Sequence, residues 1–123
     1  MISTSTIYPE IVSEIYYSKV NFGITKGWKK HNKMKMRLSS VSGSVLVVIY
    51  NPNTNNFFSS YLSLKNHQII IIDPGLWVAF RGESTNSIIM NMASIEHDPT
   101  ESDTIAIDKI NFKWPILKSN LES

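Results

Sequence analysis

The hydrophobic and polar positions of this chain form short runs that suit β-strands, with turn-forming residues between them. Residues Glu14–Val20 alternate loosely and are rich in Ile and Tyr, while every position of 45–50 is apolar or aromatic. Further short apolar runs lie at 61–64, 69–72, 77–80 and 87–92. Polar stretches at 51–56 and 81–86 separate neighbouring runs, as turns do. The pattern predicts an all-β sandwich or barrel of short strands.

The runs differ in which faces they are expected to bury. Residues 45–50 and 69–72 are apolar without interruption, which predicts strands buried on both faces. The run at 33–38 has period two, which places three apolar residues on one face and three bases on the other: Met34, Met36 and Leu38 against Lys33, Lys35 and Arg37. Sequence alone leaves open whether that basic face meets solvent or the interior of a barrel.

Length and composition narrow the class of protein. The 123 residues predict one domain, 1–123, large enough to fold without disulfides. The chain has no cysteine, which excludes disulfides, thiolate metal sites and cysteine nucleophiles. The longest apolar runs fall far short of the ~20 residues of a membrane span, and the N-terminus lacks the pattern of a signal peptide. We therefore expect a cytoplasmic protein without membrane contact.

The charges are segregated along the chain although the formal net charge is only +2. No acid occurs between Ile15 and Ile72, a span with eight bases, six of them within 26–37. The segment 96–108 has five acids and no base. A basic cluster attracts the phosphates of a small ligand, nucleic acid, or an acidic segment of its own chain. Nucleic acid is not expected, because the chain has neither an RNA-binding sheet signature nor a helix-turn-helix pattern.

Four segments, taken in chain order, resemble one known family. They are Gly23-Ile-Thr-Lys-Gly-Trp-Lys-Lys-His31, Gly43 with the apolar strand after it, Ile72-Asp-Pro-Gly-Leu-Trp-Val-Ala-Phe80, and Glu96-His-Asp-Pro99 followed by Asp108 and Trp114-Pro115. Together they are similar to the motifs of the dTDP-4-dehydrorhamnose 3,5-epimerases. The resemblance implies a cupin-type jelly roll, or double-stranded β-helix. It also implies a homodimer that exchanges N-terminal strands, with a nucleotide-diphosphate sugar bound in the barrel and no cofactor.

The chemistry that the resemblance implies is proton transfer beside a ketone. In that family a histidine base, held by an aspartate, removes a proton from a 4-keto sugar, and a tyrosine on the other face returns one. A basic group stabilises the enolate oxygen and arginines hold the diphosphate. Base and acid must therefore lie on opposite sides of the sugar ring.

This chain departs from the family at most of these positions. Lys29 stands at the base histidine, and a lysine serves as a base only when its pKa falls well below ~10.4. Lys26 stands at a phosphate-binding arginine, Asn91 at the acid tyrosine, and Asp108 near the orienting aspartate. Arg37 lies beside the position of a further family lysine. We take Lys29 and Asp108 as catalytic candidates and Lys26, Arg37 and Asn91 as substrate-binding candidates.

The histidines and tryptophans supply the remaining candidates. His31 shares a face with Lys29 in a regular strand, and His97 falls on one of the family's paired tyrosines near the barrel mouth. The two histidines form a relocated acid–base pair, or they serve in ligand binding or structure. Trp28 and Trp77 stack on a base or sugar, or belong to the core. His67 is expected at the surface.

Metal and acidic-loop chemistry are not expected. Most cupins hold a metal through two histidines spaced by one residue, a glutamate and a later histidine, and His31 alone fills such a position here. The carboxylates at 98, 101 and 103 lie in a loop containing Pro, Thr and Ser and are expected to be solvated.

Three functions remain open at this stage. The first is an epimerase or isomerase of nucleotide-sugar metabolism, in deoxysugar or cell-surface polysaccharide synthesis, using His31, Lys29 and His97. The second is a cupin that has lost catalysis and binds a sugar nucleotide or a partner protein. The third is a sugar 3,4-ketoisomerase, because that related cupin branch also uses paired histidines on this strand.

Overall fold

The computed structural model of the chain describes residues 12–66 and 68–117. Within these residues it contains nine β-strands and three short turns of 3₁₀ helix. The strands are β1 (Glu14–Val20), β2 (Thr25–His31), β3 (Met36–Ser42), β4 (Ser44–Asn51), β5 (Asn56–Ser63), β6 (Ile70–Ile72), β7 (Trp77–Gly82), β8 (Ser87–Ala93) and β9 (Ser102–Thr104). The 3₁₀ turns are η1 (Leu64–Asn66), η2 (Pro99–Glu101) and η3 (Ile107–Lys109).

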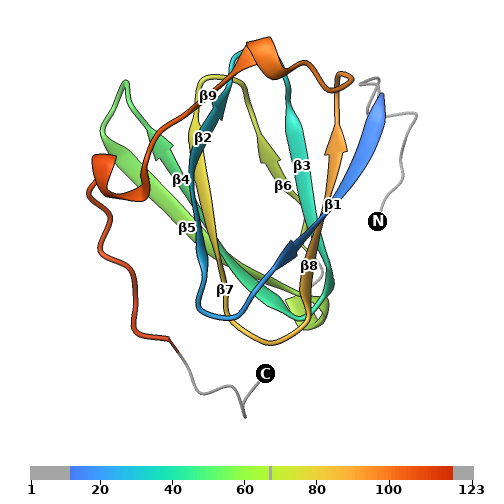
Figure 1. Ribbon diagram of the computed structural model, residues 1–123, viewed down its shortest axis with the longest axis vertical. Helices are drawn as coiled ribbons and strands as arrows, with labels where there is room; N and C mark the ends of the chain where they lie inside the picture. Colours follow the sequence, from blue (N-terminus) through green and yellow to red (C-terminus); the bar gives the residue numbers. More distant parts are fainter. Residues whose placement is uncertain (1–11, 67, 118–123) are drawn as a thin grey trace.

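The strands form two antiparallel sheets that face each other as a jelly roll (Figure 1). One sheet has the order β1-β8-β3-β6, and the other has the order β5-β4-β7-β2-β9. Most neighbours in a sheet are not consecutive in sequence, so the chain passes repeatedly from one sheet to the other. The all-β jelly roll predicted from the sequence is confirmed.

The main core lies between the two sheets. It is built from the inward-facing residues of strands in both sheets, among them Leu38 of β3, Val47 of β4 and Ile89 of β8, each at most 2% exposed. Because side chains alternate along a strand, each of these residues projects toward the facing sheet. The three apolar residues of the 33–38 run, Met34, Met36 and Leu38, are all buried on this side.

A second apolar cluster covers the outer face of the five-stranded sheet. Leu46 and Val48 of β4 point away from the main core and pack with Trp28 and Ala79. The chain after β9 covers this cluster with five partly buried side chains, Ile105, Ile107, Ile110, Phe112 and Trp114, and Figure 1 shows this segment running along the sheet. The predicted burial of 45–50 on both faces is therefore confirmed.

The isoleucine run at 69–72 behaves differently from its prediction. Ile70 and Ile72 of β6 are 8% and 2% exposed, but Ile71 is 52% exposed. β6 is the edge strand of its sheet and pairs with β3. With no layer of described residues over its outer face, only every second isoleucine is buried, so the expectation of burial on both faces is wrong.

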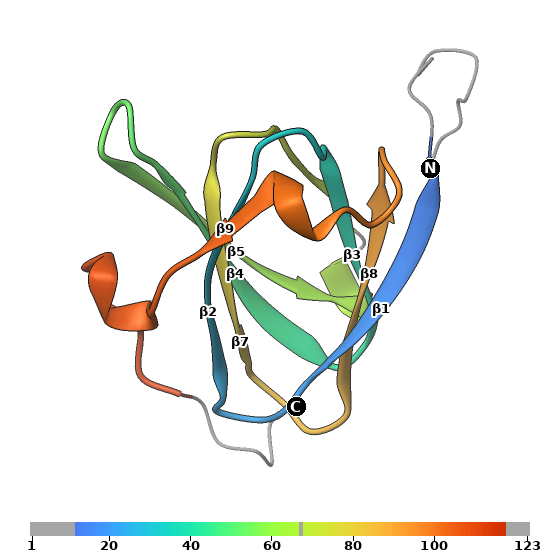
Figure 2. The same cartoon turned by 45° about the horizontal axis from the view of Figure 1, so that its top comes forward.

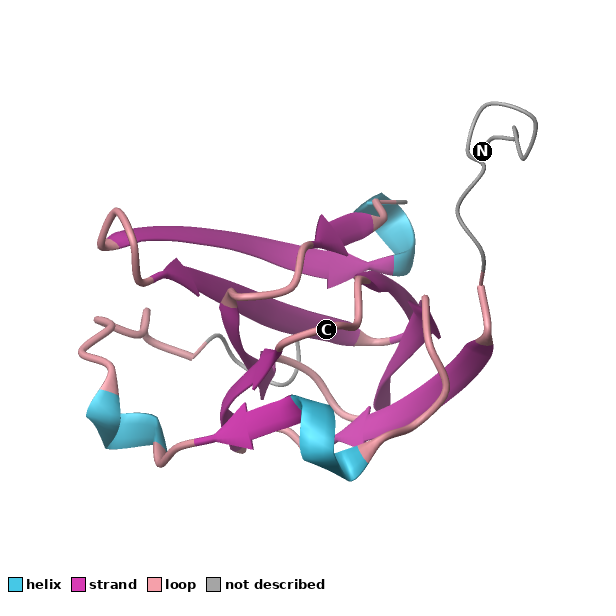
Figure 3. Ribbon diagram, turned by 90° about the horizontal axis from the view of Figure 1, so that it is seen from above, coloured by secondary structure: helices cyan, strands magenta, loops and turns pink. Residues whose placement is uncertain are grey.

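The chain after β8 closes one end of the sandwich and carries the acidic segment. It forms η2, which leads directly into β9 (Figures 2 and 3), and β9 pairs with the last three residues of β2. This pairing brings acids beside the basic strand, and Lys30 Nζ lies 3.9 Å from Asp103 Oδ2. Part of the basic cluster is thus matched by the acidic segment of the same chain.

Candidate functional site

A pocket of about 410 Å³ opens between the two sheets beside β1 and β2. Its apolar part consists of core side chains, including Met36, Leu38 and Phe80. The polar groups lie on two walls, one formed by β2 and the other by β1, β8 and the segment after β8. A pocket with an apolar floor and few convergent polar groups has the usual character of a small-molecule site.

The basic side chains of β2 reach the pocket because the strand is irregular. Its pairing with β7 shifts register between Lys26 and Lys29, as happens at a β-bulge. Strict alternation would place Lys26 on the face of Trp28, yet Lys26, Lys29 and His31 all line the pocket. Neither Lys26 nor Lys29 forms an ion pair or side-chain hydrogen bond with another described residue, so both cations are available to a ligand.

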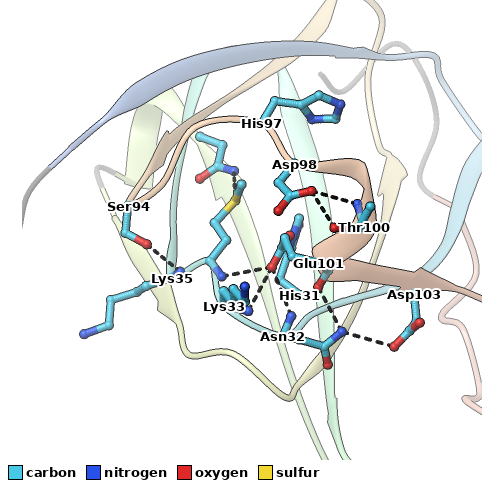
Figure 4. A network of polar contacts seen from close by, with 12 residues as sticks. His31, Asn32, Lys33, Lys35, Ser94, His97, Asp98, Thr100, Glu101 and Asp103 are labelled. Carbon is cyan, nitrogen blue, oxygen red and sulfur yellow. Dashed lines mark hydrogen bonds and ion pairs between the residues drawn. The ribbon is translucent and has the colours of Figure 1, made fainter.

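His31 is held by a carboxylate at the end of β2. Its Nδ1 contacts Oε2 of Glu101, which lies in η2, as Figure 4 shows. The two side chains are 12% and 2% exposed. Since an ionised carboxylate only accepts hydrogen bonds, Nδ1 of His31 donates to it, and in the neutral form of the ring Nε2 then keeps a lone pair. This is the arrangement of a histidine base with an orienting acid.

Glu101 is itself fixed by the backbone of the β2–β3 turn. Its Oε1 accepts hydrogen bonds from the backbone N–H groups of Asn32 (3.1 Å), Lys33 (2.8 Å) and Met34 (3.1 Å). Burial alone would raise the pKa of Glu101, but the hydrogen bonds from His31, Lys33 and Met34 outweigh burial and lower it. The expectation that this carboxylate is solvated is therefore wrong, because the turn supplies three donors to it.

The opposite wall presents Tyr16, Asn91 and His97. Tyr16 of β1 pairs directly with Asn91 of β8, and the rings of Tyr16 and His97 meet edge to face with centroids 6.4 Å apart. The Tyr16 hydroxyl donates to Glu14 Oε1 at 2.6 Å. Burial and, next, this hydrogen bond raise the pKa of Tyr16 to about 12, so the phenol is neutral at physiological pH.

Asn91 makes two contacts that hold its amide in place. Its Oδ1 accepts from the backbone N–H of Arg37 at 3.2 Å, and its Nδ2 lies 3.7 Å from the sulfur of Met34. The tyrosine that the family resemblance places at Asn91 is thus missing, but a tyrosine side chain lines the same wall from the neighbouring strand.

Five of the predicted site residues meet in the pocket, namely Lys26, Lys29, His31, Asn91 and His97. The other four lie elsewhere. Trp28 is fully buried on the outer face of the sheet and donates from Nε1 to the carbonyl of Ile107 at 3.1 Å. Trp77 packs on the same face with Lys30 over its ring. Asp108 belongs to η3, and Arg37 faces away from the pocket next to Ile71.

The sequence did not predict a role in this site for two residues, Tyr16 and Glu101. Tyr16 was part of a correctly predicted strand, but Ile15 and Tyr17 on the other face are also apolar or aromatic, so alternation did not show which face points inward. Glu101 gave no signal, because its burial depends on contacts with a turn that lies 67 to 69 residues earlier. His67 and the N-terminal residues 1–11 lie outside the described residues.

Among the described residues, no group of three or more His, Asp or Glu side chains is arranged to hold a metal ion. In the same part of the chain, no helix has the length and apolar character needed to cross a membrane.

Comparisons with known proteins agree with this architecture. Residues 2–108 match the family described as "FdtA: WxcM-like, C-terminal". No curated protein matches the sequence. A dTDP sugar isomerase from Desulfovibrio desulfuricans G20 superposes with a TM-score of 0.79 at 27% identity, over 85% of this chain and 73% of the isomerase.

Two further solved structures share the fold at lower identity. The rmlC epimerase of Mycobacterium tuberculosis has a TM-score of 0.79 at 21% identity, over 92% of this chain and 62% of the epimerase. A variant of the 3,4-ketoisomerase QdtA from Thermoanaerobacterium thermosaccharolyticum, in complex with TDP-4-keto-6-deoxyglucose, has a TM-score of 0.72 at 22% identity. That match covers 89% of this chain and 80% of the ketoisomerase. The cupin-type jelly roll is therefore the fold of this chain.

Proposed function

This chain belongs to the FdtA (WxcM-like, C-terminal) family, and we propose that it is an isomerase or epimerase of nucleotide-diphosphate sugars. The reaction would be proton transfer beside a 4-keto group. The observation that carries the proposal is the bond between His31 and Glu101 at the wall of a pocket between the two sheets. Solved structures of the same fold also support the proposal, because they include a dTDP sugar isomerase and a 3,4-ketoisomerase bound to a 4-keto sugar nucleotide.

In this proposal His31 is the base. Nε2 of the ring takes a proton from the carbon beside the keto group, and Glu101 stabilises the imidazolium that forms. The lowered pKa of Glu101 supports this role, since the acid is ionised when the histidine becomes charged. Lys29 shares the base's wall and would stabilise the developing enolate oxygen with its ammonium group.

The same proposal assigns substrate binding to the rest of the pocket. Lys26, which has no ion-pair partner among the described residues, would bind the diphosphate. Asn91 and His97 would contact the sugar from the other wall, together with Tyr16. The His31 imidazole and the Tyr16 hydroxyl would then lie on opposite sides of the sugar ring. The proposal leaves out the four predicted residues that do not line the pocket.

A homodimer through the N-terminal strands is part of the proposal. Its support is the outer face of the four-stranded sheet, where the outward positions include Ile15, Met90, Met92 and Ile71. Ile15 and Ile71 are 49% and 52% exposed, and an apolar sheet face of this kind suits contact with another copy. We also propose that the enzyme acts in the cytoplasm, where a sugar nucleotide would be used for polysaccharide synthesis.

A protein that only binds the sugar nucleotide is the competing function. The buried pair of His31 and Glu101 argues for catalysis, because a binding site has no need to orient a histidine with an ionised carboxylate.

The test is proton NMR of dTDP-4-keto-6-deoxyglucose in D₂O with the protein present. Deuterium that enters beside the keto group faster than in a protein-free control would support the proposal. Broadening of the thymidine signals without exchange would show a binding protein and would overturn catalysis. The absence of both effects would overturn the substrate as well.

A further inference from the structure

Glu14 connects two parts of the wall opposite His31. Its Oε1 accepts the hydroxyl hydrogen of Tyr16 at 2.6 Å and the backbone N–H of His97 at 2.9 Å. Glu14 and Tyr16 lie two residues apart on β1 and share its inward face. Tyr16 and His97 line the pocket, so the carboxylate holds the hydroxyl of a side chain that belongs to the pocket wall.

This bond decides what the Tyr16 hydroxyl can do toward the pocket. A phenol has one hydrogen to donate and lone pairs to accept. With its hydrogen directed at Glu14, the oxygen of Tyr16 presents only lone pairs to a ligand. The tyrosine is therefore arranged to accept a hydrogen bond from a hydroxyl group, whereas a tyrosine acting as a proton donor would need its hydrogen free.

The charges around the pair are consistent with a carboxylate that is ionised before the reaction and is therefore able to accept a proton. The hydrogen bonds from Tyr16 and from the His97 backbone lower the pKa of Glu14, and the nearby ring of His97 adds to this effect. The other acids whose charge reaches Tyr16 are Glu96 and Glu101. Neither accepts a hydrogen bond from the Tyr16 hydroxyl, so of these three acids Glu14 is the one placed to take its proton directly.

We propose that Glu14 is a positioning residue that works through Tyr16, and that the two relay the proton of a sugar hydroxyl next to the keto group. The inference rests on the proposed function, because it requires a substrate from which His31 has removed a carbon-bound proton. The inference adds that the wall opposite His31 recognises a hydrogen-bond donor on the sugar.

The relay balances as two coupled proton transfers. The sugar O–H bond breaks as a new O–H bond forms on Tyr16, and the original Tyr16 O–H bond breaks as its proton passes to the Glu14 carboxylate. The electron pair of the sugar O–H bond stays on the sugar oxygen, which becomes a carbonyl or enolate oxygen. Glu14 becomes neutral and returns its proton through Tyr16 to the former keto oxygen, which becomes a hydroxyl, while the His31 imidazolium gives its proton to the former carbonyl carbon, so no other reactant is needed.

The decisive variant is Glu14→Gln. The amide oxygen of glutamine still accepts hydrogen bonds from Tyr16 and His97, so the wall is expected to keep its shape, but the amide cannot take a proton. Glu96→Gln is the matched control, because it removes a neighbouring exposed carboxylate that lies outside the pocket lining. Tyr16→Phe removes the first member of the relay. Each protein is assayed for deuterium entry beside the keto group and for conversion of the sugar to product.

The relay predicts that the two readouts separate. In Glu14→Gln and Tyr16→Phe, deuterium entry driven by His31 persists, while product formation falls by about 10²-fold, the lower range for loss of a proton-transfer group. Glu96→Gln behaves as wild type in both readouts. Thermal unfolding of the variants checks that the fold is retained.

Three results would overturn the relay. If Glu14→Gln converts the sugar as fast as wild type, the carboxylate accepts no proton during turnover. If Glu14→Gln loses exchange and conversion in equal measure, Glu14 merely holds the wall together. If the wild-type protein gives neither exchange nor product, the proposed function fails and the relay fails with it. The first two results leave the wild-type exchange intact and so separate the failure of the relay from that of the proposed function.

Discussion

Nδ1 of His31 is hydrogen-bonded to the carboxylate of Glu101, although the two residues are 70 positions apart in the chain. The contact exists because β9 pairs with the last three residues of β2 and so brings the preceding 3₁₀ turn against the end of that strand. The same carboxylate also closes the β2–β3 turn through backbone hydrogen bonds. One side chain thus couples the local fold to the chemistry of the pocket.

The first prediction concerns the base. His31→Asn removes the imidazole, so deuterium entry beside the keto group should fall by about 10²- to 10⁴-fold, the usual range for general base catalysis. Binding of TDP, measured by calorimetry, should be nearly unchanged because Lys26 is untouched. Exchange at the wild-type rate in this variant would show that another group, such as Lys29, is the base.

The second prediction is that Glu101 contributes to stability in a pH-dependent way. Glu101→Gln keeps an oxygen for the turn but places an amide NH₂ where His31 donates, which should cost about 1–3 kcal/mol at neutral pH. Urea denaturation measures this cost. Asp103→Asn is the matched control, because that carboxylate is in the same segment but its side chain is 58% exposed.

The sign of the pH dependence follows from the lowered pKa of Glu101. A carboxyl group whose pKa is lower in the folded state binds protons more weakly there than in the unfolded chain. Its stabilisation is complete above the ordinary value of 4.5 and is lost as the pH falls through the lowered folded value. Wild type should therefore lose more stability than Glu101→Gln on acidification below 4.5. Parallel losses in the two proteins would contradict this assignment.

The third prediction tests the anion site. Lys26→Ala should weaken TDP binding about tenfold, as expected for loss of one charge-assisted contact of roughly 1.4 kcal/mol. The fold should be unaffected, because Lys26 is exposed and forms no ion pair with the described residues. Lys65→Ala, in η1 and outside the pocket lining, should bind TDP as wild type does. Equal affinity in all three proteins would refute a diphosphate site at Lys26.

The fourth prediction uses the two faces of β6. Ile70→Asp places a carboxylate in the main core, which should cost about 4 kcal/mol or more and unfold much of the protein. Ile71→Asp, one residue further on, puts the same group on the exposed face and should change the free energy of unfolding little in the monomer. Chemical denaturation compares them. A stable, cooperatively folding Ile70→Asp variant would mean that this side chain is not in the core.

The sequence was sufficient for the type of fold and for part of one wall of the site. Short apolar runs with turn residues between them indicate strands, since alternation and β-branched side chains are local properties. The spacing of Lys29 and His31 placed both on one face of β2, and both line the pocket. For 45–50, the uninterrupted apolar run correctly indicated burial on both faces.

Long-range packing decided what the pattern left open. Residues 45–50 and 69–72 look alike in sequence, but β4 lies between β5 and β7 in its sheet and is covered by the segment after β9, whereas β6 is an edge strand. The register shift in β2 put Lys26 in the pocket while leaving Trp28 in the outer cluster. A sequence pattern records the polarity of a side chain, but whether another layer covers it depends on chain segments far away.

The pairing of His31 with Glu101 shows most clearly what the sequence determines and what the tertiary structure decides. From the sequence, the only partner considered for His31 was His97, and Glu101 was one acid among several in a polar loop. Their roles arise only when β9 joins β2, because burial and three backbone donors then hold a single carboxylate beside a single ring nitrogen. Side-chain chemistry was present in the sequence, while the distances that convert it into a site are a property of the folded chain.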